Sequence, residues 1–283
     1  MKKLLYIVLV MLMVLFSVLL YSRFIGTKGL KINEKIISSD ITESYDGLKI
    51  VHFSDLHYKK VITEKRVKYL VDSINKMKPD IVLFTGDLLD KAYQLENSDI
   101  NFLIQEFSRI ETKYGAYAVL GDQDYPEEEI RNIYIQSNFT ILENNYTVIY
   151  NEDNNKILIG GLASSLDKKI NIEQLANEIS MARENTEFAY QIVILHEPDN
   201  IPKVIDSIEN TSLVLAGHSI NGSINVPGIK RLLLPIGAKE YYKSYSKINE
   251  TDVYVSNGIG VNQVNFRLFN TPSFNFYRLK KSN

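Results

Sequence analysis

The feature that most constrains the fold is a repeated pattern in which a short apolar run ends at a side chain able to bind a metal ion. Lys49–Phe53 has the composition of a buried strand, and Asp55 and His57 follow it closely. In open α/β sheets, ligands bind outside the carboxyl ends of the strands. An aspartate and a histidine two residues apart at such an end can both reach one cation. His52, inside the strand, is interpreted as a packing residue or as a residue that supports the ligands, and not as a ligand itself.

The pattern recurs along the chain. The candidate ligands, in chain order, are Asp55, His57, Asp87, Asp122, His196 and His218. One aspartate after a strand more commonly caps a helix or closes a turn. Several strand ends that each carry such a side chain indicate instead a metal site assembled across a sheet. Two divalent ions about 3.5–4 Å apart form a centre that handles phosphate ester hydrolysis.

Composition restricts the kind of site. The chain of 283 residues contains no cysteine, so any metal must be held by aspartate, histidine, asparagine and backbone oxygen. The formal net charge of −2 gives no indication of a nucleic-acid partner. Hydrophobic residues make up 45% of the chain, which is ample for a large core. The oligomeric state stays open.

The amino terminus predicts a membrane segment. Leu4–Tyr21 is uncharged and mostly apolar, at the short end of the length that spans a bilayer. Lys2 and Lys3 precede it, which favours a cytoplasmic amino terminus, and no small-x-small cleavage pattern follows. We expect residues 1–25 to be an uncleaved signal anchor of a single-pass cell-membrane protein whose remainder is extracytoplasmic. A cleaved signal peptide is the alternative.

Strand and helix patterns alternate in the rest of the chain. Alternation in Leu30–Ile36 predicts a half-buried strand, and residues 26–46 are interpreted as a linker with this first strand. Apolar residues at helical spacing predict helices at Thr63–Met77, Ser98–Ile110 and Ile170–Glu184. Pro126, followed by three glutamates, predicts the first turn of another helix. With its β-rich last quarter, the pattern favours one α/β domain, residues 47–283, with a mixed sheet or two stacked sheets.

In these motifs the chain resembles the calcineurin-like metallophosphoesterase superfamily, and most of all the bacterial branch in which a membrane segment precedes the catalytic domain. The resemblance runs from about Lys49 to the carboxyl terminus. The motifs that carry it are Ser54-Asp55-Leu56-His57, Gly86-Asp87-Leu88-Leu89-Asp90, His196 ahead of Pro198, Gly217-His218, and Tyr254 to Gly260. The resemblance implies an αββα sandwich of two mixed β-sheets flanked by helices.

The resemblance also implies a role for each candidate ligand. Asp55 and His57 would bind one divalent ion, and Asp87 would bridge to the other. The second ion would also be held by Asp122, His196 and His218. Manganese, iron or zinc suits this mixture of carboxylate and imidazole. A water or hydroxide between the ions would attack the phosphorus of the substrate. Asp87, Asp122 and Gln123 are expected to act in catalysis.

Two motifs depart from the family pattern. Where family members have Gly-Asn-His followed by Asp or Glu, this chain has Gly121-Asp122-Gln123-Asp124. Aspartate still binds a dication, but the Gln123 amide cannot give up a proton as the histidine can. Where members have Gly-His-Thr-His-Gly-Gly, Ile220 replaces the second histidine and has no ligand atom. We expect one tightly bound ion, and a weak one at Asp55/His57 that is completed by water, by Asn221 or not at all.

Two functions of different classes follow from these residues. The first is a membrane-anchored, metal-dependent phosphoesterase with a weakened active site, which acts on a phosphate mono- or diester. The second is a degenerate family member that binds a metal, a phosphate or an envelope partner without turnover. Gln123 and Ile220 are the residues that separate the two hypotheses. In a third interpretation, the acidic residues and histidines only form turns. The motifs argue against it, because several of them match the family pattern in the same order.

Overall fold

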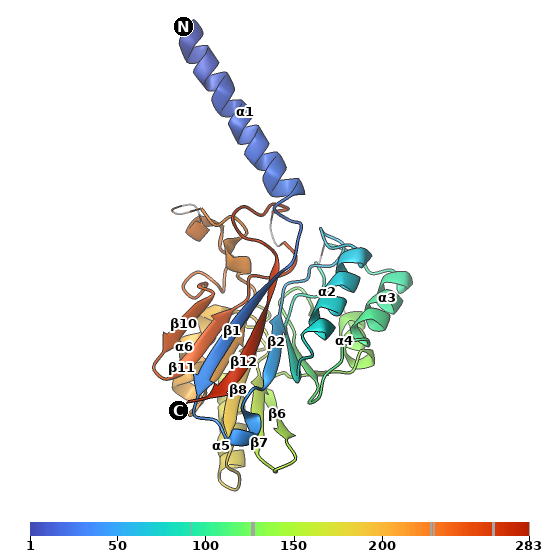
Figure 1. Ribbon diagram of the computed structural model, residues 1–283, viewed down its shortest axis with the longest axis vertical. Coiled ribbons are helices and arrows are strands. Elements are labelled where there is room, and N and C mark those ends of the chain that lie inside the picture. The colour runs from blue at the N-terminus through green and yellow to red at the C-terminus, as the bar shows by residue number, and fades with distance from the viewer. Residues whose placement is uncertain (91, 126–127, 227, 229, 262–263, 283) are drawn as a thin grey trace.

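The computed structural model describes residues 1–90, 92–125, 128–226, 228, 230–261 and 264–282. One long helix, α1 (Lys2–Phe24), stands away from the body of the molecule, as Figure 1 shows. The other α-helices described are α2 (Glu64–Lys76), α3 (Asn97–Phe107), α4 (Glu128–Gln136), α5 (Ile172–Arg183) and α6 (Ile201–Ser207). The expected turn at Pro126 lies outside the described residues, and α4 is described from Glu128.

The first sheet has the strand order β1-β12-β2-β3-β4-β5. Its strands are β1 (Lys31–Ser39), β2 (Lys49–Phe53), β3 (Ile81–Thr85), β4 (Ala116–Val119), β5 (Phe139–Ile141) and β12 (Ser273–Lys281). Strands β2 to β5 are parallel to one another, whereas β12 is antiparallel to β2 and parallel to β1. The sheet is therefore mixed, and the last strand of the chain lies between the first two.

The second sheet has the order β10-β11-β9-β8-β7-β6. Its strands are β6 (Asn145–Tyr150), β7 (Lys156–Gly161), β8 (Tyr190–Leu195), β9 (Leu213–Ala216), β10 (Tyr245–Ile248) and β11 (Thr251–Val255). Strands β7, β8, β9 and β11 run parallel, and the two edge strands are antiparallel to their neighbours. This sheet is mixed as well.

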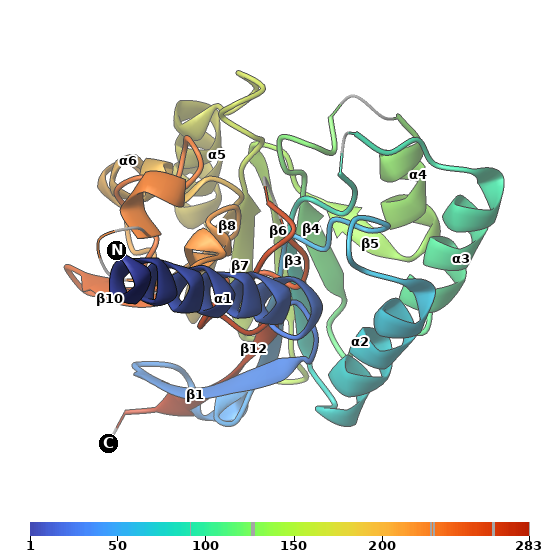
Figure 2. The same ribbon diagram turned by 90° about the horizontal axis from the view of Figure 1, so that it is seen from above.

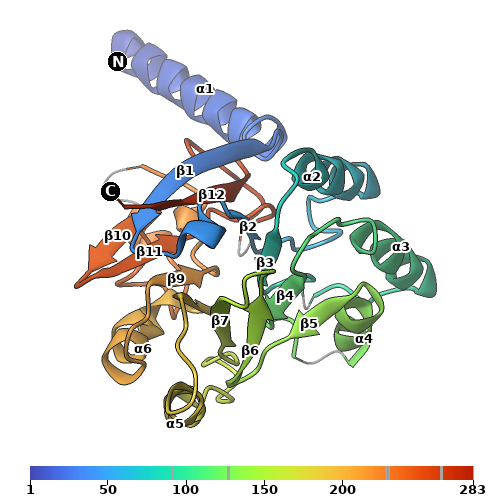
Figure 3. The same cartoon turned by 60° about the horizontal axis from the view of Figure 1, so that its bottom comes forward.

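The sheets pack face to face, with helices on both outer faces. Seen from above, α2, α3 and α4 cover one side and α5 and α6 the other, with the strands between them (Figure 2). Buried residues such as Ile81 and Leu83 of β3 share one apolar cluster with Ile192 and Ile194 of β8. Figure 3 shows the same layers from a third direction. The αββα sandwich expected from the resemblance is confirmed.

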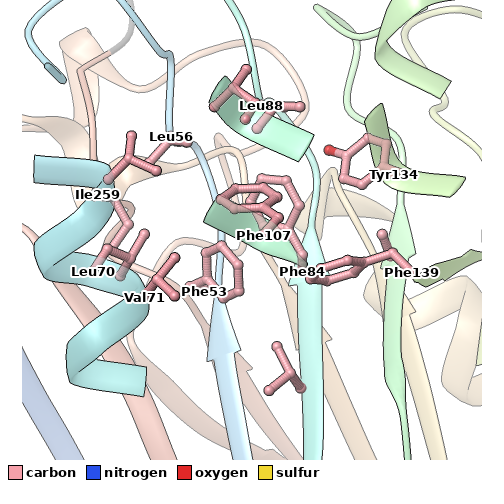
Figure 4. Close-up of a cluster of buried hydrophobic side chains, with 14 of the residues drawn as sticks. Phe53, Leu56, Leu70, Val71, Phe84, Leu88, Phe107, Tyr134, Phe139 and Ile259 are labelled. Atoms are coloured by element: carbon pink, nitrogen blue, oxygen red, sulfur yellow. The ribbon is translucent and has the colours of Figure 1, made fainter. Parts of the chain in front are cut away.

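The face of the first sheet that α2 to α4 cover is rich in aromatic side chains (Figure 4). Phe53 of β2 and Phe84 of β3 stack with ring centroids 4.5 Å apart, and Phe107 of α3 meets both at 6.4 Å in edge-to-face geometry. All three side chains are fully buried. This packing fixes the strands whose ends carry the first candidate ligands, because Phe53 lies two residues before Asp55.

Helix α1 has the properties of a membrane span. It is 23 residues long, its most apolar window has a mean hydropathy of 2.8, and none of that window is buried in the protein. A helix of this length extends roughly 34 Å, about the thickness of the hydrocarbon core of a bilayer. Its base contacts the body of the molecule, since the Arg267 backbone N–H donates to the Ser22 carbonyl at 3.0 Å.

Candidate metal centre

The candidate ligands lie at the carboxyl ends of five strands from both sheets. Strand β2 precedes Asp55 and His57, β3 precedes Asp87, and β4 precedes Asp122; β8 and β9 precede His196 and His218. The two sheets meet here, because His196 Nδ1 lies 2.6 Å from the Thr85 carbonyl oxygen at the end of β3. Each side chain therefore reaches one shared region from a loop that a rigid strand supports.

Asp87 lies where two groups of ligand atoms overlap. One atom from each of Asp87, Asp122, His196 and His218 lies within 4.8 Å of the others, and Asp55, His57 and Asp87 meet the same limit. Asp87 Oδ2 is 3.3 Å from His196 Nε2 and 3.7 Å from His57 Nε2. The structure thus brings all six predicted ligands together, and Asp87 is the residue common to both groups.

Backbone carbonyl groups fix the orientation of two histidines. His196 Nδ1 donates to Thr85 O at 2.6 Å, and His218 Nε2 donates to Ile236 O at 2.7 Å. The remaining nitrogens, His196 Nε2 and His218 Nδ1, face each other at 3.1 Å. Each is also close to Asp122 Oδ1, at 3.5 and 3.3 Å. Outer hydrogen bonds that turn imidazole lone pairs toward one point are typical of metal-binding histidines.

The other half of the cluster has buried polar atoms without hydrogen-bond partners. Asp55 and His57 are fully buried. Asp55 Oδ1 and both ring nitrogens of His57 make no hydrogen bond in the described part of the chain. Leaving such groups buried and unsatisfied costs about 1–3 kcal/mol each, more for charged groups. A cation between Asp55 Oδ1 and His57 Nε2, which are 3.9 Å apart, would satisfy both atoms.

The electrostatics of the cluster favour a positive charge at its centre. Burial lowers the pKa of His196, but the charge of Asp87 and a hydrogen bond to Asp122 outweigh burial and raise the pKa well above its ordinary value. Burial acts to raise the pKa of Asp122, yet hydrogen bonds from His196 and His218 lower it. Asp122 therefore stays ionised and can stabilise a cation, whereas burial raises the pKa of Asp55. With carboxylate and imidazole donors, the residues present fit a divalent transition-metal ion.

The backbone at the ligands is strained in a way that brings them together. Asp55, His57, Asp87 and His218 have φ angles of 51°, 44°, 61° and 62°, in the left-handed region that non-glycine residues seldom adopt. The loop that contains Gly121 also comes so close to Asp87 that this position requires glycine. A Cβ atom added at Gly121 would lie 2.1 Å from Asp87 Oδ1. Such strain is common at functional sites, where the surrounding structure holds the side chains in place.

Asp124 holds the loop that carries Asp87, a role that nothing in the sequence indicates beyond the place of Asp124 in the motif. Its carboxylate accepts hydrogen bonds from the backbone N–H groups of Asp87 at 2.8 Å, Leu88 at 2.9 Å and Gly121 at 3.0 Å. Burial, and then the charge of Asp87, raise the pKa of Asp124 to about 7. Asp124 is a positioning residue, because it fixes Asp87 through the backbone.

Gln123 is turned toward Asp87. Its backbone N–H donates to Asp87 Oδ1 at 3.1 Å, and its side-chain Nε2 lies 3.4 Å from Asp87 Oδ2. The side chain is buried, with a residue exposure of 5%. The amide therefore supports the shared carboxylate, and it has no proton to transfer.

Ile220 lies beside the Asp55 half of the cluster. An added Cβ atom at Gly258 would be 3.0 Å from Asp55 Cβ and 3.3 Å from Ile220 Cγ1, so both side chains flank the same glycine. Ile220 is buried and supplies no ligand atom. The neighbouring Asn221 does not replace it here, because its Oδ1 accepts a hydrogen bond from Lys230 Nζ. The expected completion of this half by Asn221 therefore has no support in the structure.

The roles of two further buried residues were not equally predictable from the sequence. His52 bonds through Nε2 to Thr85 Oγ1 at 2.9 Å, and burial lowers its pKa to about 3, so it is a neutral packing residue as expected. Arg267 was not anticipated. Its fully buried guanidinium donates to the carbonyl oxygens of Asn257, Gly258 and Gly260, in the loop that packs on Asp55. Nothing local in the sequence marks these long-range contacts.

Comparisons with known proteins agree with the geometry. The family model for calcineurin-like phosphoesterases matches residues 48–222. The metallophosphoesterase YkuE of Bacillus subtilis is 28% identical over 269 residues, which cover 93% of this chain and 90% of YkuE. A transmembrane protein with a metallophosphoesterase domain from Danio rerio is 21% identical over 235 residues, 81% of this chain and 52% of that protein.

A solved structure supports the fold alone. The sulfate thiohydrolase SoxB of Thermus thermophilus superposes with a TM-score of 0.53 at 10% sequence identity. The superposition covers 86% of this chain and 58% of SoxB. At this identity the likeness extends to the arrangement of sheets and helices and to nothing more specific.

Proposed function

The chain belongs to the calcineurin-like phosphoesterase family, and from this premise we propose that it is a membrane-anchored metallophosphoesterase that hydrolyses a phosphate mono- or diester. The observation that carries the proposal is the convergence of buried donor atoms around Asp87. Burying carboxylates and imidazoles at this density is costly, and a cation among them offsets that cost.

The proposed ligands fall into two unequal sets. Asp87, Asp122, His196 and His218 hold the tighter divalent ion, of manganese, iron or zinc type. Asp55 and His57 share Asp87 and hold a second ion weakly, because Ile220 contributes no donor. When bound, divalent ions at such a centre polarise the phosphoryl oxygen and generate a nucleophile from water at neutral pH.

The residues of the chain then have separate tasks in the proposed reaction. His196 and His218 keep their lone pairs directed inward, because Thr85 O and Ile236 O bind their other nitrogens. Gln123 orients Asp87 and cannot protonate a leaving group. General acid catalysis contributes about 10²–10⁴-fold where it operates. Esters whose leaving groups need little protonation, such as aryl esters, are therefore the better substrates.

The proposal includes the place of the chain at the cell membrane. Helix α1, within residues 1–25, anchors a single-pass protein, residues 26–46 form a linker and the first strand, and residues 47–283 form the catalytic domain outside the cytoplasm. The length and full exposure of α1 support the anchor. Lys2 and Lys3 before it support the orientation, and Arg23, Lys28 and Lys31 after it reduce this charge asymmetry.

Hydrolysis of simple esters tests the proposal. The full chain in detergent, with added manganese, should hydrolyse bis-aryl or mono-aryl phosphates, and alkyl phosphates more slowly by about 10²-fold or more. Asp87→Ala should lose the activity while circular dichroism stays unchanged. Equal rates with aryl and alkyl esters would refute the role given to Gln123, and activity that persists in Asp87→Ala would refute the site.

The second candidate function is metal or phosphate binding without turnover, and the observation that favours it is the pair of substitutions at Gln123 and Ile220. The double substitution Gln123→His, Ile220→His separates the candidates. A weakened enzyme should gain hydrolysis by about 10²-fold or more. If the parent chain is inactive and the double variant gains nothing, the binding function is the better account.

A further inference from the structure

A large open groove lies between the base of α1 and the helix α2, and none of the six candidate ligands lines it. Its volume is about 1130 Å³, and its lining residues come from 23–30 of the α1 exit and 60–72 of the α2 region, with Ile259. Figures 1 and 3 both show the amino-terminal part of α2 next to the lower end of α1. If α1 crosses a membrane, the groove opens where the helix leaves the bilayer.

The groove is strongly basic. The cationic side chains that line it are Arg23, Lys28, Lys60, Lys65, Arg66 and Lys68. Asp72 is the carboxylate among the lining residues that the structure describes, and it is already paired with Arg109 at 2.5 Å. Lys60 is paired with Asp90 at 2.5 Å. Five cations at the groove are thus left without a carboxylate partner among the described residues, although the whole chain has a net charge of −2.

Arg66 of α2 is one of these cations. It is half-buried, and its guanidinium donates to the carbonyl oxygens of Val61 at 3.2 Å and Gly29 at 3.4 Å. A guanidinium has five N–H donors in a planar fork that matches a phosphate. No ion pair with a carboxylate is found for Arg66 in the described ranges, so part of its fork is available for an anion.

Exposed aromatic rings border the cations. Phe24, at the end of α1, is 55% exposed, and Tyr69 of α2 is 59% exposed. Rings with an apolar body beside basic side chains are typical of the layer between the head groups and the acyl chains of a bilayer. A free phosphate ion would use the cations but has nothing to place against these rings.

We propose that the groove between α1 and α2 binds the phosphate-bearing head group of an anionic membrane lipid. The cations neutralise the phosphate, and the rings contact the upper part of the acyl chains. Each basic residue near an anionic membrane surface strengthens this attraction. The inference rests on the proposed anchorage by α1, and it gives the catalytic domain a fixed orientation on the membrane.

Native mass spectrometry of the full chain in detergent tests the proposal. With an equimolar mixture of phosphatidylglycerol and phosphatidylcholine, the protein should retain one phosphatidylglycerol preferentially. The variant Lys28→Gln, Lys65→Gln, Lys68→Gln changes three exposed side chains and should reduce this retention by at least about tenfold. Arg66→Gln should do so as well. The matched control is Lys35→Gln, Lys76→Gln, Lys113→Gln, with the same change of charge outside the groove.

Three outcomes would overturn the proposal. They are equal retention of both lipids, unchanged retention in the lysine variant, and displacement of the lipid by excess inorganic phosphate, which would make the groove a site for free phosphate. The hydrolysis assay separates this inference from the proposed activity. Asp87→Ala should retain the lipid fully, and the lysine variant should hydrolyse a soluble aryl ester at the parent rate.

Discussion

At the scale of single residues, the neighbours of Asp87 explain why the candidate ligands meet. Asp87 accepts from Gln123, its backbone is held by Asp124, and Gly121 leaves the space that its carboxylate occupies. All six candidate ligands were predicted from sequence, because a polar residue at the end of an apolar run marks its own position. The roles of Asp124 and Arg267 were not, because both bind backbone groups of segments that are distant in sequence.

Gly121→Ala tests the space around Asp87. The added methyl group would lie within 2.1 Å of Asp87 Oδ1, against backbone and a fixed carboxylate. We expect metal affinity to fall by roughly 10–100-fold, as for other changes that misplace a ligand. Metal binding followed by calorimetry gives the measurement. Gly160→Ala is the control, because its methyl would meet only side-chain ends of Leu175 and Ile179 at 3.3 Å and beyond, and its affinity should be unchanged.

At the scale of elements, periodicity predicted helices within a few residues of their observed ends. The expected helix Thr63–Met77 is observed as Glu64–Lys76, and Ile170–Glu184 as Ile172–Arg183. The sequence could not predict that β12 pairs between β1 and β2, because strand order depends on contacts between distant segments. Nor could it show how the connection from β5 to β6 joins the two sheets.

Glu143 stabilises this connection. Its carboxylate accepts from Arg131 of α4 at 2.5 and 2.8 Å and from Tyr125 at 2.7 Å. Burial acts to raise the pKa of Glu143, but these hydrogen bonds outweigh it and lower the pKa below its ordinary value of 4.5. A folded-state pKa below the unfolded value means that the ionised group stabilises the fold above that unfolded value. This contribution is lost as pH falls through the folded pKa.

Glu143→Gln should therefore destabilise the protein by about 1 kcal/mol at neutral pH. The difference from the parent chain should shrink as the pH falls below about 4.5. Urea unfolding of the full chain in detergent at several pH values measures it. Glu152→Gln, at an exposed position, should have no effect. A difference that is constant across this pH range would contradict the role of the ionised carboxylate.

At the scale of the whole molecule, two sheets supply complementary parts of one centre. The first sheet contributes Asp55, His57, Asp87 and Asp122, and the second contributes His196 and His218. The sequence indicated a layered α/β domain, and the resemblance gave the αββα order. The contact of Ser22 with Arg267 and the basic groove beside α1 could not be predicted, because both depend on where α1 meets the body.

The most direct test of the account is metal stoichiometry. The full chain, stripped with a chelator, loaded with manganese and passed through a desalting column, should retain one ion per chain when measured by plasma mass spectrometry. Ile220→His should retain two, because the Asp55/His57 half then gains its missing nitrogen donor. Two firmly held ions in the parent chain, or none, would contradict the unequal centre around Asp87.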